Sequence, residues 1–363
     1  MNSFIWFTSN YWMMASNLDE LERLRELDKD GMLEHLGRFP EDCRLAIERA
    51  ERVSLGDLAG RVFKAVVFAG MGGSAIGGRL IKDWLSAESE IPIEVSGGYS
   101  LPKFVDDNTL VLSVSYSGNT EETLSMFREA LDVGSPIVSF TSGGELERLS
   151  KEKGIPVASM PGGLKPRAAL PYQFFMLAAV LERLGLAPLS GEVDEAIDVL
   201  GDARDELVPE VPAESNLAKK LALDLYNMIP FVYGSELLSS VAYRFGTQLN
   251  ENSKVPAVSG AFPELFHNAA LVSEAPRGVL EPLCLLFIRD SLESDKMSRK
   301  IDRFKALFES RVGRVLEVRT RGRGKLARMF SILLLGDYVS TYLALLYGHD
   351  PSSMDAIDEL KRE

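Results

Sequence analysis

Residue types that build disulfide frameworks and metal centres are scarce in this chain of 363 residues. It contains two cysteines, Cys43 and Cys284, which lie in separate regions, and only three histidines. This scarcity predicts neither a disulfide nor a metal site, and a buried structural thiol is the default for each cysteine. Excess positive charge is also absent: the formal net charge is −13, which argues against nonspecific nucleic-acid binding. Small anionic substrates stay possible, because a local positive site can exist on an acidic surface.

Signals for membrane insertion or secretion are missing too. The most apolar stretch, residues 329–347, contains Asp337, a glycine and several hydroxyls, and therefore predicts a core helix instead of a membrane span. The aromatic first thirteen residues lack the basic start and long apolar core of a signal peptide. They are expected to be a dispensable extension or the product of an upstream start, because a capped helix start follows at residues 15–21. The expected location is the cytoplasm.

Short apolar segments alternate with helical patterns over most of the chain. Residues 15–60 carry leucines at helical spacing, and strands and helices alternate from residue 63 onward. Such alternation predicts parallel sheets covered on both faces, with ligands at the C-terminal ends of the strands. The expected strands are about 63–69, 91–95, 109–114, 136–140 and 155–159 in a first sheet and about 230–234, 256–258, 283–288 and 313–319 in a second.

The second half of the chain resembles a degenerate copy of the first. We therefore predict an α/β protein with two doubly wound parallel-sheet domains, N-terminal helices and a C-terminal helical tail. The expected parts are an N-terminal extension with helices at 1–60, a first domain at 61–190, a connecting region at 191–214, a second domain at 215–348 and a tail at 349–363.

Residues 115–120, with the sequence SYSGNT, are the most informative segment of the chain. They lie between a predicted buried strand and a predicted helix, so three aliphatic hydroxyls and one glycine fall in a strand-to-helix turn. Free backbone N–H groups and the positive end of the helix dipole meet at such a turn, which suits a phosphate. An ordinary helix N-cap is the alternative, since serine, threonine and asparagine are preferred there.

A second turn of this kind occupies residues 70–78, with the sequence GMGGSAIGG, after the first predicted strand. Its glycines allow a ligand to approach the backbone closely. The spacing of Gly70, Gly72 and Ala75, with Glu94 about twenty residues further on, also matches a loose dinucleotide fingerprint. The alternative is a single phosphate shared between this turn and the serine-rich turn of a neighbouring strand.

Three further side chains have the chemistry of an acid–base site. Glu251 lies at the end of a predicted helix, His267 follows sixteen residues later, and Arg167 lies in a turn with glycine and proline. Each alone has an ordinary structural explanation, as a solvated acid, a partly buried histidine or an ion-paired arginine. Together with the phosphate-type turns they fit a phosphosugar isomerase, with a glutamate base, a histidine for ring opening and an arginine for the developing enediolate. This chemistry requires no metal or organic cofactor.

These motifs resemble the SIS (sugar isomerase) superfamily, and specifically its bifunctional phosphoglucose/phosphomannose isomerases. The resemblance runs from about Leu18 to Lys361 and rests on the two turns and on PRA at 166–168, NENSK at 250–254 and ELFHN at 264–268. It implies two SIS domains and a homodimer. The implied reaction interconverts glucose 6-phosphate or mannose 6-phosphate with fructose 6-phosphate by base-mediated proton transfer between C1 and C2.

The resemblance also implies roles for individual residues. Glu251 would be the base, Arg167 the cation near the enediolate, and His267 the ring-opening residue, contributed by the neighbouring chain of the dimer. Lys361 resembles a C-terminal active-site lysine, and Met354 stands where related enzymes carry a polar residue. The implied phosphate- and substrate-binding residues are Gly72, Gly73, Ser74, Ser115, Ser117 and Thr120.

Two other functions stay open on the sequence alone. A SIS-type sensor would bind a phosphosugar through residues 115–120 without chemistry, and it would not need Glu251 or His267. A dinucleotide-dependent oxidoreductase is the third hypothesis, but it leaves residues 115–120 and Glu251 unexplained. The expected partners are a hexose 6-phosphate and a second copy of the chain, with neither nucleic acid nor a membrane.

Overall fold

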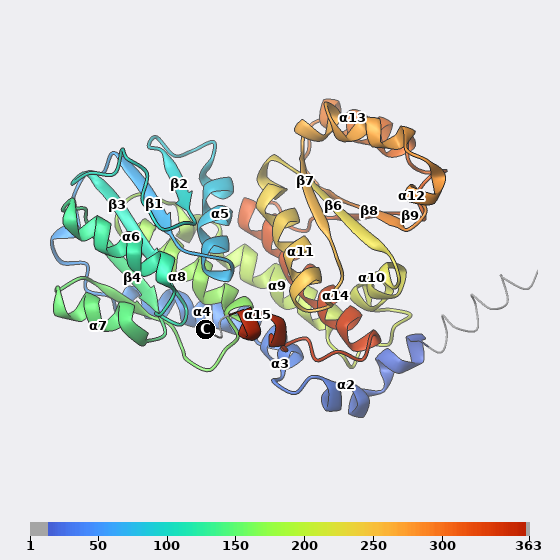
Figure 1. Ribbon diagram of the computed structural model, residues 1–363, viewed down its shortest axis with the longest axis horizontal. Coiled ribbons are helices and arrows are strands. Elements are labelled where there is room, and N and C mark those ends of the chain that lie inside the picture. Colours follow the sequence, from blue (N-terminus) through green and yellow to red (C-terminus); the bar gives the residue numbers. More distant parts are fainter. Residues whose placement is uncertain (1–13, 361–363) are drawn as a thin grey trace, which may run out of the picture. The chain divides into compact units, whose positions relative to one another are not determined.

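The computed structural model of the protein describes residues 14–360. They form two compact units: a first-sheet unit of residues 39–194 and a second-sheet unit of residues 14–38 and 195–360. Each unit is built on one parallel sheet (Figure 1), which confirms the predicted α/β fold. The domain bounds expected from the sequence remain predictions. The expectations for the first thirteen residues and for Lys361 concern positions outside the described residues.

The first-sheet unit contains five parallel strands in the order β2-β1-β3-β4-β5. The chain moves outward from β1 to β2 and then crosses back to β3, so the strand order reverses between β1 and β3. Ligands of open α/β sheets bind at this reversal, outside the C-terminal ends of the strands. The strands are β1 (Ala65–Ala69), β2 (Ile93–Ser96), β3 (Thr109–Val114), β4 (Ile137–Thr141) and β5 (Val157–Ser159).

Helices cover both faces of the first sheet. The helices of this unit are α4 (Phe39–Glu51), α5 (Gly73–Leu85), α6 (Glu121–Asp132), α7 (Gly144–Glu152) and α8 (Leu170–Arg183). On one face, Met126 of α6 packs in a core cluster with Val67 and Val111. Neighbouring strand residues point to opposite faces, and Phe68 accordingly contacts Gly78 of α5 on the other face. α8 is apolar all round and is buried along nearly its whole length.

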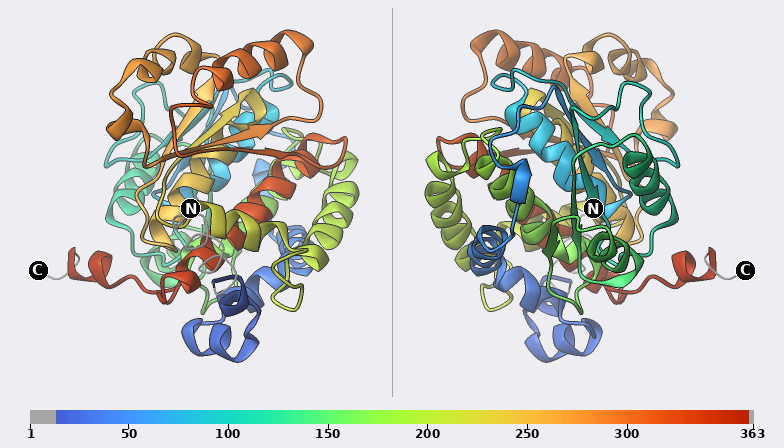
Figure 2. Two further views of the ribbon diagram at one scale, coloured as in Figure 1. Left: turned by 90° about the vertical axis from the view of Figure 1, so that its right-hand side faces the viewer. Right: turned by 90° about the vertical axis from the view of Figure 1, so that its left-hand side faces the viewer.

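The second-sheet unit contains four parallel strands in the order β7-β6-β8-β9, so the order reverses between β6 and β8. Helices α13 and α14 lie on opposite faces of this sheet (Figures 1 and 2). The strands are β6 (Ile229–Ser235), β7 (Val258–Phe262), β8 (Leu283–Arg289) and β9 (Arg314–Arg319). The helices are α2 (Leu21–Leu27), α3 (Met32–Gly37), α9 (Val193–Leu207), α10 (Leu217–Leu225), α11 (Ser239–Glu251), α12 (Arg277–Leu280), α13 (Asp295–Ala306), α14 (Lys325–Leu346) and α15 (Asp355–Leu360).

Two segments differ from the expectations. The strand expected at 256–258 begins later, because Pro256 has no N–H and the N–H of Ala257 donates to Asn250 Oδ1 at 2.8 Å. β7 therefore pairs with β6 only from Val258 onward. The expected connecting region at 191–214 is largely helical, since it contains the whole fifteen-residue helix α9.

A buried lysine attaches the N-terminal helices to the second-sheet unit. Lys219 of α10 is fully buried, and its Nζ donates to Asp19 Oδ1 and to the carbonyl oxygen of Pro209, each at 2.8 Å. The N–H of Ala213 donates to the same carboxylate oxygen of Asp19 at 2.9 Å. These bonds integrate the helical residues 14–19 into the unit, as the predicted helix start at residues 15–21 requires.

Helix α14 is long and apolar enough to cross a membrane by length and composition, but 94% of its most apolar window is buried within the protein. It is therefore a core helix, as predicted for residues 329–347. Its buried Asp337 accepts hydrogen bonds from Arg244 Nη2 at 2.9 and 3.1 Å and from Gln248 Nε2 at 2.9 Å. Burial raises the pKa of Asp337, and the Arg244 guanidinium opposes that rise. A buried ion pair thus holds α11 on α14.

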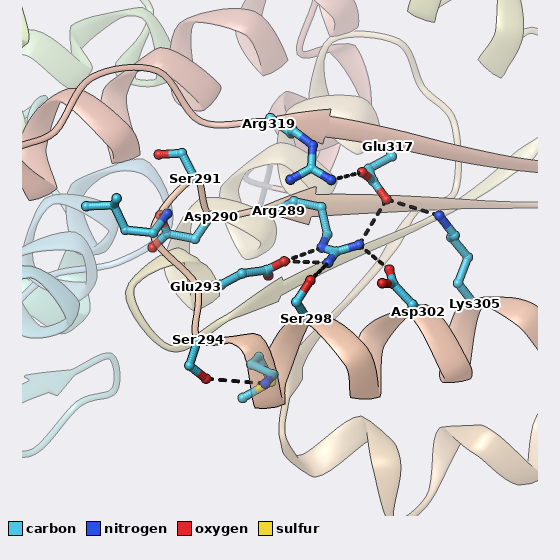
Figure 3. Close-up of polar contacts among 12 residues, drawn as sticks. Arg289, Asp290, Ser291, Glu293, Ser294, Ser298, Asp302, Lys305, Glu317 and Arg319 are labelled. Atoms are coloured by element: carbon cyan, nitrogen blue, oxygen red, sulfur yellow. Dashed lines mark hydrogen bonds and ion pairs between the residues drawn. The ribbon is translucent and has the colours of Figure 1, made fainter.

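A second polar cluster lies at the C-terminal end of β8 (Figure 3). The buried Arg289 guanidinium contacts Asp302 Oδ1 at 2.7 Å, Glu317 Oε2 at 3.0 Å and Glu293 Oε1 at 2.9 Å. Lys305 Nζ and Arg319 Nη2 then approach Glu317 at 3.2 and 2.7 Å. Three cations and three carboxylates therefore neutralise one another within this cluster.

Glu317 makes the stability of the second-sheet unit depend on pH. Burial raises the pKa of Glu317, but Lys305 and Arg289 outweigh burial, and its pKa lies below the ordinary value of a glutamate. A lowered pKa contributes stability above about pH 4.3, where free glutamate titrates, and this contribution is lost as the pH falls further. We expect Glu317→Gln to lower the free energy of unfolding by up to about 1 kcal/mol at pH 7. Urea unfolding should show the difference from wild type shrinking below pH 4; a difference independent of pH would contradict this account.

Candidate active site

The serine-rich turn lies at the strand-order reversal of the first sheet. Ser115 follows β3 and is fully buried, and its Oγ lies 2.9 Å from Thr120 Oγ1. The N–H of Gly118 donates to Ser115 Oγ at 3.1 Å, which closes the turn. Thr120 occupies the N-cap position of α6, but its side chain makes no capping hydrogen bond to the helix. The ordinary capping interpretation therefore does not describe Thr120, whereas Ser117 remains exposed at the mouth of the turn.

The glycine-rich turn adjoins the serine-rich turn. Gly70 lies so close to the end of β3 that a Cβ there would be 2.8 Å from the carbonyl oxygen of Val114. The N–H of Tyr116 donates to Ser74 Oγ at 3.2 Å, which joins the two turns directly. Gly72 is the N-cap residue of α5 and has a φ of +49°, so the start of this helix has no side-chain cap. The helices α5 and α6 thus begin next to each other, an arrangement that suits one shared phosphate.

The dinucleotide alternative receives no support from Glu94. In a dinucleotide site, this acid would bind ribose hydroxyls. Glu94 instead forms an ion pair with Lys82 of α5, with 2.8 Å between Nζ and Oε2.

Tyr116 also fixes the loop that carries Arg167. Its hydroxyl donates to the carbonyl oxygen of Pro161 at 2.8 Å and accepts from the N–H of Leu164 at 2.8 Å. A 3-10 helix (Pro166–Ala169) follows, and a Cβ on Gly73 would lie 3.5 Å from Pro166. Arg167 is only 2% exposed, so its charge is buried near the start of α5. Burial raises the pKa of Tyr116, which keeps its hydroxyl protonated as the donor this loop needs.

The loop after β4 packs against the serine-rich turn. It was not among the segments predicted from the sequence to form the site. Ser142 Oγ donates to the carbonyl oxygen of Tyr116 at 2.6 Å. Gly118 packs so tightly on this loop that a Cβ there would lie 1.8 Å from the carbonyl oxygen of Gly143. The adjacent glycines at 143 and 144, a few residues after a predicted strand, were the available sequence signal.

The first-sheet unit therefore gathers one group of the predicted site residues. These residues are Gly72, Gly73, Ser74, Ser115, Ser117, Thr120 and Arg167. Their roles remain predictions. Over residues 14–360, no group of three or more histidine, cysteine, aspartate or glutamate side chains is placed to hold a metal ion.

Glu251 and His267 belong to the second-sheet unit. The helix that carries Glu251 and the segment that carries His267 lie on opposite faces of β7. Glu251 is the last residue of α11 and is partly exposed; His267 is exposed and follows the 3-10 helix after β7. α11 packs on the face of β7 lined by Ser259, since a Cβ on Gly246 would lie 3.6 Å from the Ser259 side chain. A Cβ on Gly260 would instead meet Leu265 at 2.7 Å, which places the His267 segment on the opposite face.

The second sheet offers no equivalent phosphate turn at its own strand-order reversal. Asp290 directly follows β8, the strand in the position that β3 takes in the first sheet, and it is ion-paired with Arg328. The N–H of Ser291 is already donated to Thr320 Oγ1 at 2.8 Å. Acidic side chains and an engaged backbone disfavour a phosphate there.

Two parallel α/β sheets, with a hydroxyl-rich turn at the strand-order reversal of the first, define a protein of the SIS fold. The fold resembles a crystal structure of a hypothetical protein from Thermus thermophilus, with a TM-score of 0.74, 18% identity, and coverage of 97% of this chain and 94% of that chain. Residues 214–363 match the family model described as the bacterial phospho-glucose isomerase C-terminal SIS domain.

Curated relatives specify the family further. The chain is 40% identical over 334 residues to a bifunctional phosphoglucose/phosphomannose isomerase from Caldicellulosiruptor bescii, covering 92% of this chain and 98% of the relative. It is 36% identical to a protein of the same name from Aquifex aeolicus, covering 83% of this chain and 90% of that relative. The chain belongs to the bifunctional phosphoglucose/phosphomannose isomerase family, as its motifs implied.

Gly118 provides a test of the tight contact beneath the serine-rich turn. Gly118 and Gly134 both have a φ of +71°, but only Gly118 has backbone atoms where a Cβ would lie. We expect Gly134→Ala to cost about 1 kcal/mol of stability, the usual penalty for a left-handed alanine. Gly118→Ala should cost at least about 3 kcal/mol, because the Gly143 loop must also move.

Urea unfolding and titration with fructose 6-phosphate measure both effects. Gly134→Ala should bind the sugar phosphate as wild type does, and Gly118→Ala should bind it more weakly. Equal losses of stability in the two variants would contradict the role of the close contact.

Proposed function

We propose that the protein interconverts glucose 6-phosphate and mannose 6-phosphate with fructose 6-phosphate. Family membership supports this reaction class. The observation that carries the proposal is the hydrogen bond from Tyr116 N–H to Ser74 Oγ, because it brings two phosphate-type turns to one place. The sugar phosphate would take N–H groups from the starts of α5 and α6 and hydroxyls from Ser74, Ser115, Ser117 and Thr120.

The proposed proton transfer assigns one role to each charged group. The Glu251 carboxylate removes the proton from C2 of the open-chain aldose, and the electron pair of that C–H bond forms the C1–C2 double bond of an enediolate. The Arg167 guanidinium balances the negative charge that develops on oxygen. A proton also passes from the C2 hydroxyl to O1, and Glu251 returns its proton to C1, which gives the ketose. Both epimers at C2 lead to the same enediolate, and one base serves both when it reaches C2 from either face or when the C2–C3 bond rotates before reprotonation.

We also propose that the working form is a dimer in which His267 opens the sugar ring bound by the neighbouring chain. The support is geometric: within one chain, α11 and the His267 segment occupy opposite faces of β7. Their distance along the strand adds to this separation, since Asn250 contacts Ala257 before β7 and His267 follows it. A five-residue strand spans about 16 Å.

We expect Glu251→Gln to reduce kcat for fructose 6-phosphate about a hundredfold or more, because the amide cannot accept the C2 or C1 proton. Binding through the two turns should persist, so KM should change much less. Coupled assays for glucose 6-phosphate and mannose 6-phosphate, together with solvent deuterium exchange into the sugar, measure the loss. Glu309→Gln, which removes an exposed acid of the same unit, is the matched control.

The same assays separate the proposal from its rivals. Tight binding of hexose 6-phosphates to the wild type without hydrogen exchange would favour a sensor, and reduction of NAD would favour an oxidoreductase. Glucosamine 6-phosphate belongs in the panel, because one relative, from Sulfolobus acidocaldarius, is a D-glucosamine-6-phosphate 4-epimerase that is 32% identical over 59% of this chain.

Mixing two inactive variants tests the dimer. If His267 acts on the neighbouring chain, a heterodimer of Glu251→Gln and His267→Ala chains contains one site with both native residues. Random exchange of equal amounts should then restore about a quarter of wild-type activity. If His267 acts within its own chain, exchange restores nothing. Mass spectrometry of the intact assemblies verifies that heterodimers form, so a negative result counts against the shared site.

A cytoplasmic location is also proposed. Its support is that Cys43 and Cys284 are both buried free thiols, a state that suits a reducing compartment.

A further inference from the structure

Lys254, three residues after Glu251, adopts a backbone conformation that lysine rarely takes. Its φ is +60°, in the left-handed region that glycine usually occupies at the end of a helix. A left-handed side-chain residue costs roughly 1–2 kcal/mol, and such strain often marks a functional position. The presence of a lysine where glycine is favoured suggests that the lysine side chain makes an interaction that offsets this cost.

The Lys254 ammonium group is directed at main-chain carbonyl oxygens. Nζ lies 2.7 Å from the oxygen of Glu251, 3.0 Å from that of Ser353 and 3.4 Å from that of Asp350. An ammonium group has three N–H donors, which these three acceptors can use completely. The contacts therefore describe a joint between two chain segments and not a cation reserved for substrate.

One segment of this joint is the end of α11. It is fixed from the core side by two hydrogen bonds to α14: Asn252 Nδ2 donates to Ser340 Oγ at 2.9 Å, and Ser253 Oγ donates to the carbonyl oxygen of Ser340 at 2.7 Å. Together with the Arg244–Asp337 pair, these bonds form a polar seam along α11. Lys254 adds a direct hydrogen bond to the main chain of Glu251, from its Nζ to the Glu251 carbonyl oxygen.

The other segment is the turn that begins the C-terminal tail. Gly348 follows the end of α14, and residues 350–353 lead into α15. This turn has internal support, since the N–H of Ser352 donates to Asp350 Oδ1 at 2.8 Å. Lys254 bonds to this turn and to the end of α11, and it therefore couples the position of the tail to that of the Glu251 helix end.

We propose that Lys254 is a positioning residue that holds Glu251 and the start of the C-terminal tail in fixed relation. Its role in catalysis rests on the proposed function, in which Glu251 is the base. Its structural role does not, because the joint involves only atoms of the second-sheet unit. Loss of the joint is expected to free the turn at residues 350–353 and to leave the Glu251 main chain less constrained.

Lys254→Asn is the informative variant, because asparagine tolerates the left-handed backbone but cannot reach the tail carbonyls. We expect the thermal unfolding midpoint to be no lower than that of wild type. Amide hydrogen exchange should become faster in peptides covering residues 350–360. For fructose 6-phosphate, kcat should fall about tenfold or more with KM changed less than about threefold, as small displacements of a catalytic group produce.

Two further variants make the result specific. Lys254→Arg keeps a cation with several donors and should recover most of the protection and activity. Lys296→Asn removes an exposed lysine of α13 and should change neither readout. The pH dependence of kcat/KM should keep its shape in Lys254→Asn, because a positioning residue does not itself exchange the reacting proton.

The outcomes separate this inference from the proposed function. Unchanged hydrogen exchange at residues 350–360 in Lys254→Asn would overturn the joint, whatever the enzyme catalyses. Faster exchange with unchanged kcat in an active isomerase would overturn the positioning role. A raised KM with unchanged kcat would assign Lys254 to substrate binding instead. A wild-type protein without isomerase activity would refute the proposed function, and the exchange measurement would still decide the joint.

Discussion

One hydrogen bond, from the Tyr116 N–H to Ser74 Oγ, joins the two strand ends on which the phosphate-type site is built. It is possible only because β1 and β3 are neighbours at the strand-order reversal and because Gly70 has no side chain to hold them apart. Two helices consequently begin side by side, with their N–H groups and dipoles directed to one place. The hydroxyls supply further donors without charge, a chemistry that suits an anion which binds and leaves again.

The second-sheet unit repeats this topology, but its turn has a different chemistry. At its reversal, the turn after β8 carries Asp290, and the adjacent Arg289 guanidinium is enclosed by carboxylates (Figure 3). Because these charges are already paired and the N–H of Ser291 is already donated to Thr320, this turn does not suit a phosphate. What the unit contributes instead is a rigid helix end, since the Arg244–Asp337 pair and the Asn252–Ser340 bond fix α11 on the core helix α14.

The sequence predicts most of this fold because its strands and helices have clear apolar periods and glycine-rich boundaries. The two turns were recognisable because their hydroxyls and glycines are contiguous. The role of the Tyr116 hydroxyl was not, since its partners Pro161 and Leu164 lie 45 and 48 residues away. Lys254 was hidden for the same reason, because Ser353 is 99 residues distant. Contacts between residues so far apart depend on tertiary structure, which a local pattern does not encode.

In the proposed mechanism, one sugar meets both Glu251 and His267, whose supporting segments are separated within the chain. A carboxylate at the end of α11 and an imidazole beyond β7 are supported from opposite faces of the same strand. Leu265, two residues before His267, packs in the core cluster with Phe262 and Phe287, which holds the His267 segment on its face of β7. Burial of such a side chain is worth roughly 1.5–3 kcal/mol, and the proposed dimer leaves this packing in place. Activity would then depend on protein concentration through dimer assembly.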